Sequence, residues 1–305
     1  MVKAVKKQID LTDFLHLYPF ESKYFNVNGF KYHFVDEGCG EPVVMVHGNP
    51  TWSFYFRSLI KEFSKNYRTI AVDHIGCGLS EKPGTKQYGF KLKNRVNDFE
   101  TFMNQLNLKE KITLVVHDWG GAIGLIYALR NLDKIGRVIV TNTSCFFPPE
   151  GKTIPKRLKI VRNISTFATP AVLGFNLFSV SALYMASEKK LSKSVKKGLK
   201  APYNCWNNRL ATLKFVQDIP IDKTDNSYDL IKFLDENSFK LSDIPMFICW
   251  GGKDFVFDRA YYNEWVNRFP HAQASCINYA GHYLLEDAPG EVTAAIKDFL
   301  SNNPI

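Results

Sequence analysis

The segment Val116-His117-Asp118-Trp119-Gly120-Gly121 constrains the fold more than any other part of this chain. It follows the apolar run Ile112–Val116 and precedes an apolar helical pattern over 122–129. A strand, a tight turn with small residues and a helix form the setting of a nucleophile elbow. The common form of this motif places Ser between glycines. Here Asp118 stands at the apex, and Val116 takes the place of the first glycine.

An aspartate at the apex predicts a particular kind of chemistry. A serine needs a base to become nucleophilic, whereas a carboxylate is already ionised at pH 7. Asp118 therefore suits displacement at carbon, which leaves an ester on the enzyme that must then break down. The competing interpretation is an ordinary Asp N-cap at the start of a helix. The other motifs of the chain favour the nucleophile.

Length, composition and cysteine usage bound the class of protein. The 305 residues, 45% hydrophobic and 23% charged, suit one large α/β domain with an insertion. We expect neither a transmembrane segment nor a signal peptide, because no apolar run is long enough and the first 25 residues lack an apolar core. The six cysteines form no Cys-x-x-Cys pair, which favours reduced thiols in a cytoplasmic protein. The net charge of +9 does not by itself indicate a nucleic-acid partner.

Strand-like segments alternate with helical ones along the chain. This alternation predicts an α/β fold with a largely parallel sheet that helices cover on both faces. The expected strands are Tyr32–Val35, Val43–Val46, Thr69–Val72, Ile112–Val116, Val138–Thr141, Met246–Trp250 and Ala274–Ile277.

About 100 residues, from Phe146 to Asp243, separate the fifth of these strands from the sixth, and their pattern is mostly helical. An insertion of this kind predicts a helical cap over the C-terminal ends of the strands, where open α/β sheets bind ligands. We therefore predict a core formed by residues 1–146 and 243–305, and a cap formed by residues 147–242.

One cap segment is unusually basic. Six lysines between 189 and 200 surround Leu191, Val195 and Leu199, which recur every four positions. This spacing predicts an amphipathic helix with a lysine face. A solvated face, a surface for a partner protein and a surface for an anionic membrane are all compatible with it.

The loop after the second expected strand, His47-Gly48-Asn49-Pro50-Thr51-Trp52, predicts an anion-binding site. In elbow-containing folds this loop supplies one backbone N–H to the reacting oxygen, and the residue after the nucleophile supplies the other. The two donors would be Asn49 and Trp119, whose side chains also carry N–H groups that would point into the pocket. Two such donors without positive charge suit a departing halide or a small carboxylate. Alternatively, Asn49-Pro50 is only a turn.

His282, in the segment Ala280–Asp287 after the last expected strand, is the candidate general base. Asp118 needs no deprotonation, so His282 would activate water against the ester, with an ordinary pKa near neutrality. Asp254, directly after the strand Met246–Trp250, is the candidate orienting acid, and Asp258 is the alternative. We expect no metal and no cofactor, because no His-Glu-x-x-His motif, no Cys/His cluster and no phosphate-binding glycine loop occurs.

The set Asn49, Asp118, Trp119, Asp254 and His282 resembles the haloalkane dehalogenases of the α/β-hydrolase fold, in the subfamily with an Asp-His-Asp triad. The resemblance implies a mostly parallel eight-stranded sheet with a helical cap. Within that family, the chain is most similar to the β-lactone decarboxylases of bacterial long-chain olefin biosynthesis. The motifs behind this second likeness are Asn142-Thr143, Ala201-Pro202-Tyr203, Trp206-x-Asn208-Arg209, Phe215-x-Gln217-Asp218-Ile219-Pro220 and Trp250-Gly251-x-x-Asp254-x-x-Phe257-Asp258.

The resemblance implies that Asp118 attacks a cis-3,4-dialkyl β-lactone and that loss of CO₂ leaves a cis-alkene. The small apolar substrate carries two long alkyl chains, which require apolar tunnels. Candidate tunnel residues in the cap are Phe167, Phe175, Phe178 and Leu183. The resemblance also implies assembly with other enzymes of olefin biosynthesis, for which the lysine-rich helix is a candidate surface.

Three other functions remain open. In a haloalkane dehalogenase, Asp118 would displace halide from carbon, and His282 would hydrolyse the alkyl ester. In an epoxide hydrolase, cap tyrosines would protonate the epoxide oxygen, and Tyr184 and Tyr203 are available. A non-catalytic scaffold is the last alternative, and the complete triad argues against it.

Overall fold

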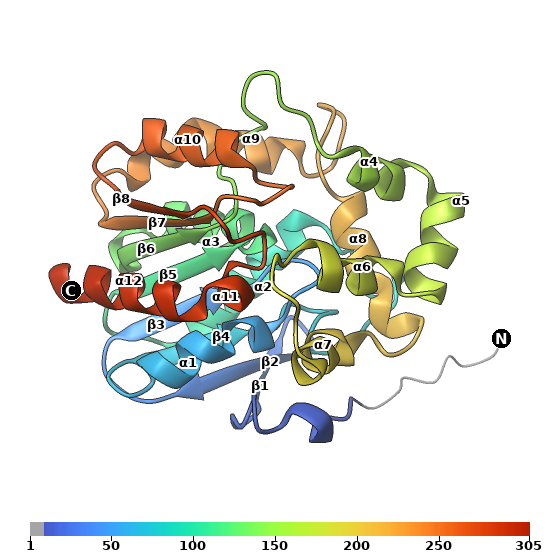
Figure 1. Cartoon of the computed structure of the whole chain (residues 1–305), viewed down its shortest axis with the longest axis horizontal. Helices are drawn as coiled ribbons and strands as arrows, with labels where there is room; N and C mark the ends of the chain where they lie inside the picture. The colour runs from blue at the N-terminus through green and yellow to red at the C-terminus, as the bar shows by residue number, and fades with distance from the viewer. Residues whose placement is uncertain (1–8) are drawn as a thin grey trace.

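The computed structural model describes residues 9–305, and this part of the chain folds around one eight-stranded sheet (Figure 1). All seven strands expected from the sequence are present. The additional strand, β1, lies at the edge of the sheet, and only its last residue, Val27, is fully buried. The strands are β1 Lys23–Val27, β2 Phe30–Glu37, β3 Pro42–Val46, β4 Arg68–Val72, β5 Ile112–His117, β6 Ile135–Thr141, β7 Met246–Gly251 and β8 Gln273–Ile277.

The order of the strands is β1-β2-β4-β3-β5-β6-β7-β8. The pairs β1/β2 and β2/β4 are antiparallel, and all the other pairs are parallel. Val46 at the end of β3 pairs with Val116 near the end of β5, and Thr141 at the end of β6 pairs with Cys249 of β7. The C-terminal ends of four neighbouring strands therefore meet at one edge of the sheet, where ligands bind in this class of fold.

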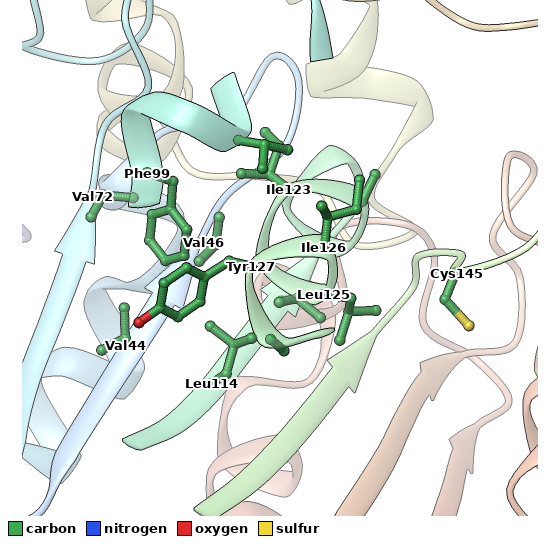
Figure 2. Packing of buried hydrophobic residues seen from close by; sticks show 14 of the residues in the cluster. Val44, Val46, Val72, Phe99, Leu114, Ile123, Leu125, Ile126, Tyr127 and Cys145 are labelled. Carbon is green, nitrogen blue, oxygen red and sulfur yellow. The ribbon is translucent and has the colours of Figure 1, made fainter. Parts of the chain in front are cut away.

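Alternate residues of the buried strands point to opposite faces of the sheet. Val44, Val46 and Val116 join one hydrophobic core, whereas Val43 and Met45 join the other. Figure 2 shows part of the first core, in which Tyr127 and Ile123 of α3 pack near Phe99 of α2 and the valines of the sheet. The helices α2 Leu92–Leu106, α3 Trp119–Arg130 and α10 Arg259–Arg268 contribute to the first core, and α1 Arg57–Phe63, α11 Leu284–Asp287 and α12 Pro289–Asn302 contribute to the second.

The long insertion between β6 and β7 is helical, as predicted, and most of it lies along one side of the molecule (Figure 1). Helix α8 packs against α4, whereas α9 packs against α3 and buries Leu234 in the first core. The boundaries 147 and 242 stay a prediction. The insertion contains α4 Lys156–Asn163, α5 Ser165–Ala168, the π-helix η4 Thr169–Gly174, α6 Leu177–Met185, α7 Lys193–Lys200, α8 Leu210–Gln217 and α9 Tyr228–Asn237, with short 3₁₀ turns at Ala201–Tyr203, Asn207–Arg209 and Ser238–Leu241.

Among residues 9–305, no single helix has both the length and the apolar composition needed to cross a membrane. The consecutive segments Ser165–Gly174 and Leu177–Met185 reach those limits only when they are taken together, and the chain bends by 77° between them.

Candidate active site

Asp118 occupies a strained turn between β5 and α3. Its backbone angles are φ 51° and ψ −127°, a region that residues other than glycine rarely adopt. Two glycines make this turn fit. A Cβ atom on Gly48 would collide with the Asp118 carboxylate, and one on Gly120 would collide with the Val46 carbonyl. The strand, the turn and the helix therefore form the elbow that the sequence predicts, with the carboxylate at its apex.

The Asp118 carboxylate is buried but has hydrogen-bond donors. The Asn49 backbone N–H donates to Asp118 Oδ1 at 2.8 Å. Burial raises the pKa of the Asp118 carboxyl, and the nearby His282, together with the N–H groups of Trp119 and Asn49, partly offsets that rise. The backbone N–H groups at positions 49 and 119, which the sequence predicts to donate to a reacting oxygen, thus donate to the Asp118 carboxylate instead.

His282 lies between two carboxylates. Its Nδ1 is 2.7 Å from Asp254 Oδ2, and its Nε2 is 3.6 Å from Asp118 Oδ2. Burial alone would lower the pKa of His282, but the charges of Asp254 and Asp118 outweigh it, so the pKa is raised. The expectation of an ordinary histidine pKa is therefore wrong, because the balance between burial and the two carboxylate charges depends on distances that a sequence does not give.

Asp254, and not the alternative Asp258, is the carboxylate that contacts His282. Asp258 caps α10 and forms an ion pair with Lys152. Asp254 Oδ1 accepts hydrogen bonds from the backbone N–H groups of Val256 at 2.6 Å and Phe257 at 3.1 Å. These two bonds leave Oδ2 directed at the histidine ring.

Asn142, directly after β6, is a supporting residue that sequence reasoning missed. Its Nδ2 donates to Asp254 Oδ2 at 2.9 Å, and its Oδ1 accepts from the Gly251 N–H at 2.8 Å. Its carbonyl also accepts the Asp118 N–H at 3.2 Å. The sequence offers a signal, since Asn142 directly follows a buried strand, as Asp254 does.

Replacement of Asn142 by Ala is expected to lower kcat about tenfold and to destabilise the fold by about 2 kcal/mol. The reason is that Asp254 and the Gly251 N–H each lose a buried partner. The measurements are steady-state kinetics and urea unfolding. Asn107→Ala is the matched control, because Asn107 has a similar φ of 47° and is exposed outside the site. Equal effects of both changes would assign the loss to backbone strain.

Asn49 and Trp119 both line the cavity in front of Asp118. The sequence predicts that both side chains donate into this cavity, and the structure modifies that prediction for Asn49. Its Nδ2 donates one hydrogen to the Thr212 carbonyl at 3.0 Å. An amide nitrogen carries two hydrogens, so one remains for a bound anion. Among residues 9–305, the Trp119 indole N–H has no hydrogen-bond partner, and its ring packs against Phe215.

The cavity has a volume of about 310 Å³, and its walls are mostly apolar. Of the four tunnel residues that we predict, Phe167 and Phe178 line it. Phe175 and Leu183 do not, which corrects the prediction. Phe175 is 76% exposed beyond the end of η4, and Leu183 is buried in the second hydrophobic core. A helical pattern does not specify which apolar side of a cap helix faces the cavity.

The two tyrosines considered for epoxide chemistry lie elsewhere. Tyr184 is 67% exposed, and the Tyr203 hydroxyl donates to the Thr51 carbonyl at 3.2 Å. Neither lines the cavity. Arg209 has a structural role, because it donates to the carbonyls of Tyr203, Leu173 and Gly174.

The fold and the elbow define the class of protein. The family model described as the alpha/beta hydrolase fold matches residues 41–289, and the chain belongs to this family. Solved structures agree at the level of the fold. The haloalkane dehalogenase DatA from Agrobacterium tumefaciens C58 superposes with a TM-score of 0.82 at 22% identity, covering 93% of this chain and 97% of DatA.

Sequence relatives fall into two groups. A cis-3-alkyl-4-alkyloxetan-2-one decarboxylase of Shewanella oneidensis is 46% identical over 93% of this chain and 90% of its own length. A protein of the same name from Xanthomonas campestris pv. campestris is 35% identical over 94% of this chain and 98% of its own. Haloalkane dehalogenase 2 of Mycobacterium tuberculosis is 30% identical over 94% of this chain and 98% of its own length. The chain is thus similar both to decarboxylases and, at lower identity, to dehalogenases.

Proposed function

We propose that this chain is a cis-3-alkyl-4-alkyloxetan-2-one decarboxylase, which converts a long-chain cis-β-lactone into a cis-alkene and CO₂. The observation that carries the proposal is the 46% identity, over 93% of the chain, to a relative of that name. The cavity supports it, because an apolar space with Asp118 in its wall suits a substrate made of alkyl chains around one reactive ring.

In this proposal Asp118 is the nucleophile. An Asp118 oxygen attacks the ring carbon C4, the C4–O bond breaks, and the substrate becomes an alkyl ester with a free carboxylate on C3. The electron pair of the C3–carboxylate bond then forms the double bond, CO₂ leaves, and the Asp118 carboxylate is expelled. Inversion at C4 followed by anti elimination gives the cis-alkene. No water is consumed, and the side-chain N–H groups of Asn49 and Trp119 hold the carboxylate oxygens as they form.

His282 and Asp254 complete the proposed triad. Asp254 holds Nδ1 of His282, so Nε2 faces Asp118. In a dehalogenase, this nitrogen would activate water against the ester. In the decarboxylase, the partly protonated ring stabilises the Asp118 carboxylate as it leaves. The same five residues therefore support haloalkane hydrolysis as the second candidate function, favoured by the 30% identity to a dehalogenase.

The test is turnover of the purified protein on two substrates side by side. One is a synthetic cis-β-lactone with two medium alkyl chains, measured as alkene by gas chromatography. The other is a 1-bromoalkane, measured as released bromide. Fast alkene formation with slow bromide release supports the decarboxylase. Fast bromide release without alkene contradicts it and supports the dehalogenase.

Hydrolysis of an alkyl ester by this site is expected to depend on pH through His282. Only the neutral ring is a base, and the pKa of His282 is raised, so the rate should increase with pH and reach half its maximum above about pH 6.5. Asp254→Asn removes the main charge that raises the pKa, so the midpoint should move to lower pH. The measurement is the pH profile of bromide release. An unchanged midpoint in the Asp254 variant would contradict the assignment.

We further propose that the chain acts in the cytoplasm and assembles with the enzymes that form its β-lactone. Unpaired cysteines throughout residues 9–305 support a reducing compartment. Co-purification of a tagged β-lactone-forming enzyme with this chain tests the assembly, and its absence under conditions that preserve both activities would contradict it.

A further inference from the structure

The positive charge of this protein is concentrated in one segment. Residues 147–209 contain twelve of the 39 Lys and Arg residues but only two of the 30 Asp and Glu residues. This segment therefore carries a charge of +10, whereas the whole chain carries +9 and the remainder is close to neutral. Within residues 9–305, only Lys152, Arg162 and Lys197 of these twelve form an ion pair. Arg209 donates to three backbone carbonyls, and the other eight basic side chains are available to an anionic surface.

The same segment exposes large apolar side chains. Residues 163–187 contain no charged residue, and basic residues lie on both sides of them, at 156–162 and 189–200. Seven of the fifteen large hydrophobic side chains that are exposed in residues 9–305 belong to this segment. They are Ile160, Ile164, Phe167, Phe175, Leu177, Tyr184 and Trp206. We call these seven side chains, together with the lysines at 156–162 and 189–200, the cap surface.

The cap surface is continuous. Each of the helices α4, α5, η4, α6 and α7 contacts the next, and Figure 1 shows them along the side of the molecule opposite the C-terminus. The Trp206 ring lies beside Gly174, next to Phe175. Lys196 Nζ lies 4.1 Å from the centre of the Tyr184 ring. At Lys196 and Tyr184 a basic and an aromatic side chain therefore lie together, a combination that is common on proteins that lie in the interface of a membrane.

The cavity and the cap surface share two side chains. Phe167 and Leu177 both line the cavity, yet they are 52% and 46% exposed. Phe167 and Leu177 therefore connect the mostly apolar wall of the cavity with the exposed apolar side chains of the cap surface.

We propose that the cap surface docks on an anionic lipid bilayer, so that alkyl chains pass between the bilayer and the cavity without crossing water. The basic side chains would contact lipid phosphates, and Phe175, Trp206 and Tyr184 would enter the interface. The apolar stretch is formed by two segments, Ser165–Gly174 and Leu177–Met185, with a bend of 77° between them. The assignment of these alkyl chains to a β-lactone rests on the function proposed above. The docking on the bilayer does not depend on that function.

Sedimentation with vesicles tests the charge on the cap surface. The full chain is expected to bind vesicles of phosphatidylglycerol and phosphatidylcholine, to bind pure phosphatidylcholine at least about tenfold more weakly, and to dissociate in high salt. The triple variant Lys156→Gln, Lys190→Gln, Lys193→Gln should bind about 100-fold more weakly, at about fivefold per lysine. The control is Lys111→Gln, Lys134→Gln, Lys297→Gln, three exposed lysines outside the insertion that form no ion pair within residues 9–305.

A second pair of variants tests the apolar component. Phe175→Ser should weaken vesicle binding about tenfold, because the ring no longer enters the interface. Phe239→Ser is the matched control, since Phe239 is 65% exposed but lies outside the cap surface, and this change should leave binding unaffected. Phe175 does not line the cavity, so turnover of a short, water-soluble substrate should be the same in all these variants.

Equal binding to anionic and neutral vesicles, or equal losses in the test and control variants, would overturn the proposal. If the lysine variant loses a partner enzyme in co-purification while no protein binds vesicles, the face is a protein interface and the proposal is wrong. Asp118→Ala separates the two proposals. It should bind vesicles like the wild type whether or not the chain is a decarboxylase.

Discussion

Replacement of Asp118 by Ala is expected to reduce alkene formation from a cis-β-lactone about 10⁴-fold, with the same loss of bromide release from a bromoalkane. Both reactions begin with attack by this carboxylate, and removal of the nucleophile costs this much in enzymes that form covalent intermediates. The measurement is kcat/KM on each substrate. Asp118→Asn tests the same point with the shape of the side chain retained.

The fold is expected to survive both changes. A buried carboxylate with a raised pKa costs free energy, so a neutral side chain at position 118 should leave the melting temperature unchanged or raise it. Asp133→Asn is the matched control, because Asp133 is exposed outside the cavity. Turnover of Asp118→Ala near the wild-type rate would reject Asp118 as the nucleophile.

Replacement of His282 by Gln is expected to separate the two chemistries of this site. Hydrolysis of an ester on Asp118 needs a base, and its loss should slow bromide turnover about 10³-fold after roughly one bromide per chain. Decarboxylation as we propose it needs no water, so alkene formation should fall only about tenfold. The measurements are bromide and alkene time courses, with the mass of the protein recorded after each.

A trapped alkyl group on Asp118 in the bromoalkane reaction, and none in the lactone reaction, is the pattern that the proposal requires. Equal losses of alkene and bromide would show that His282 acts in a step that both reactions share, and the water-free route would then be wrong. His271→Gln is the control, because His271 is exposed and outside the cavity.

Local sequence identified the parts of the site that sit at the ends of strands. The elbow at Asp118, the loop at Asn49 and the segments at Asp254 and His282 each follow a strand. Because neighbouring parallel strands end at the same edge of a sheet, their order along the chain was enough to predict that these residues meet. The distance of 2.7 Å between His282 and Asp254 agrees with that expectation.

The cap was harder to predict for a physical reason. Helix α6 is apolar on every side, so its pattern does not distinguish Leu183, which enters the core, from Leu177, which lines the cavity. Phe175 is aromatic, like other residues that line the cavity, but it lies at a turn that exposes its side chain to solvent. Such assignments depend on contacts between helices that are distant in sequence.

Short-range patterns and strand order are enough to predict the α/β class, the elbow and the set Asn49, Asp118, Trp119, Asp254 and His282. The tertiary structure decided the support of Asp254 by Asn142, the engagement of Asn49 by Thr212 and the raised pKa of His282. Basic and apolar residues from several helices also come together only in the folded chain, on the cap surface. Each of these depends on burial and on distances between segments far apart in the chain, which packing fixes and a linear pattern does not contain.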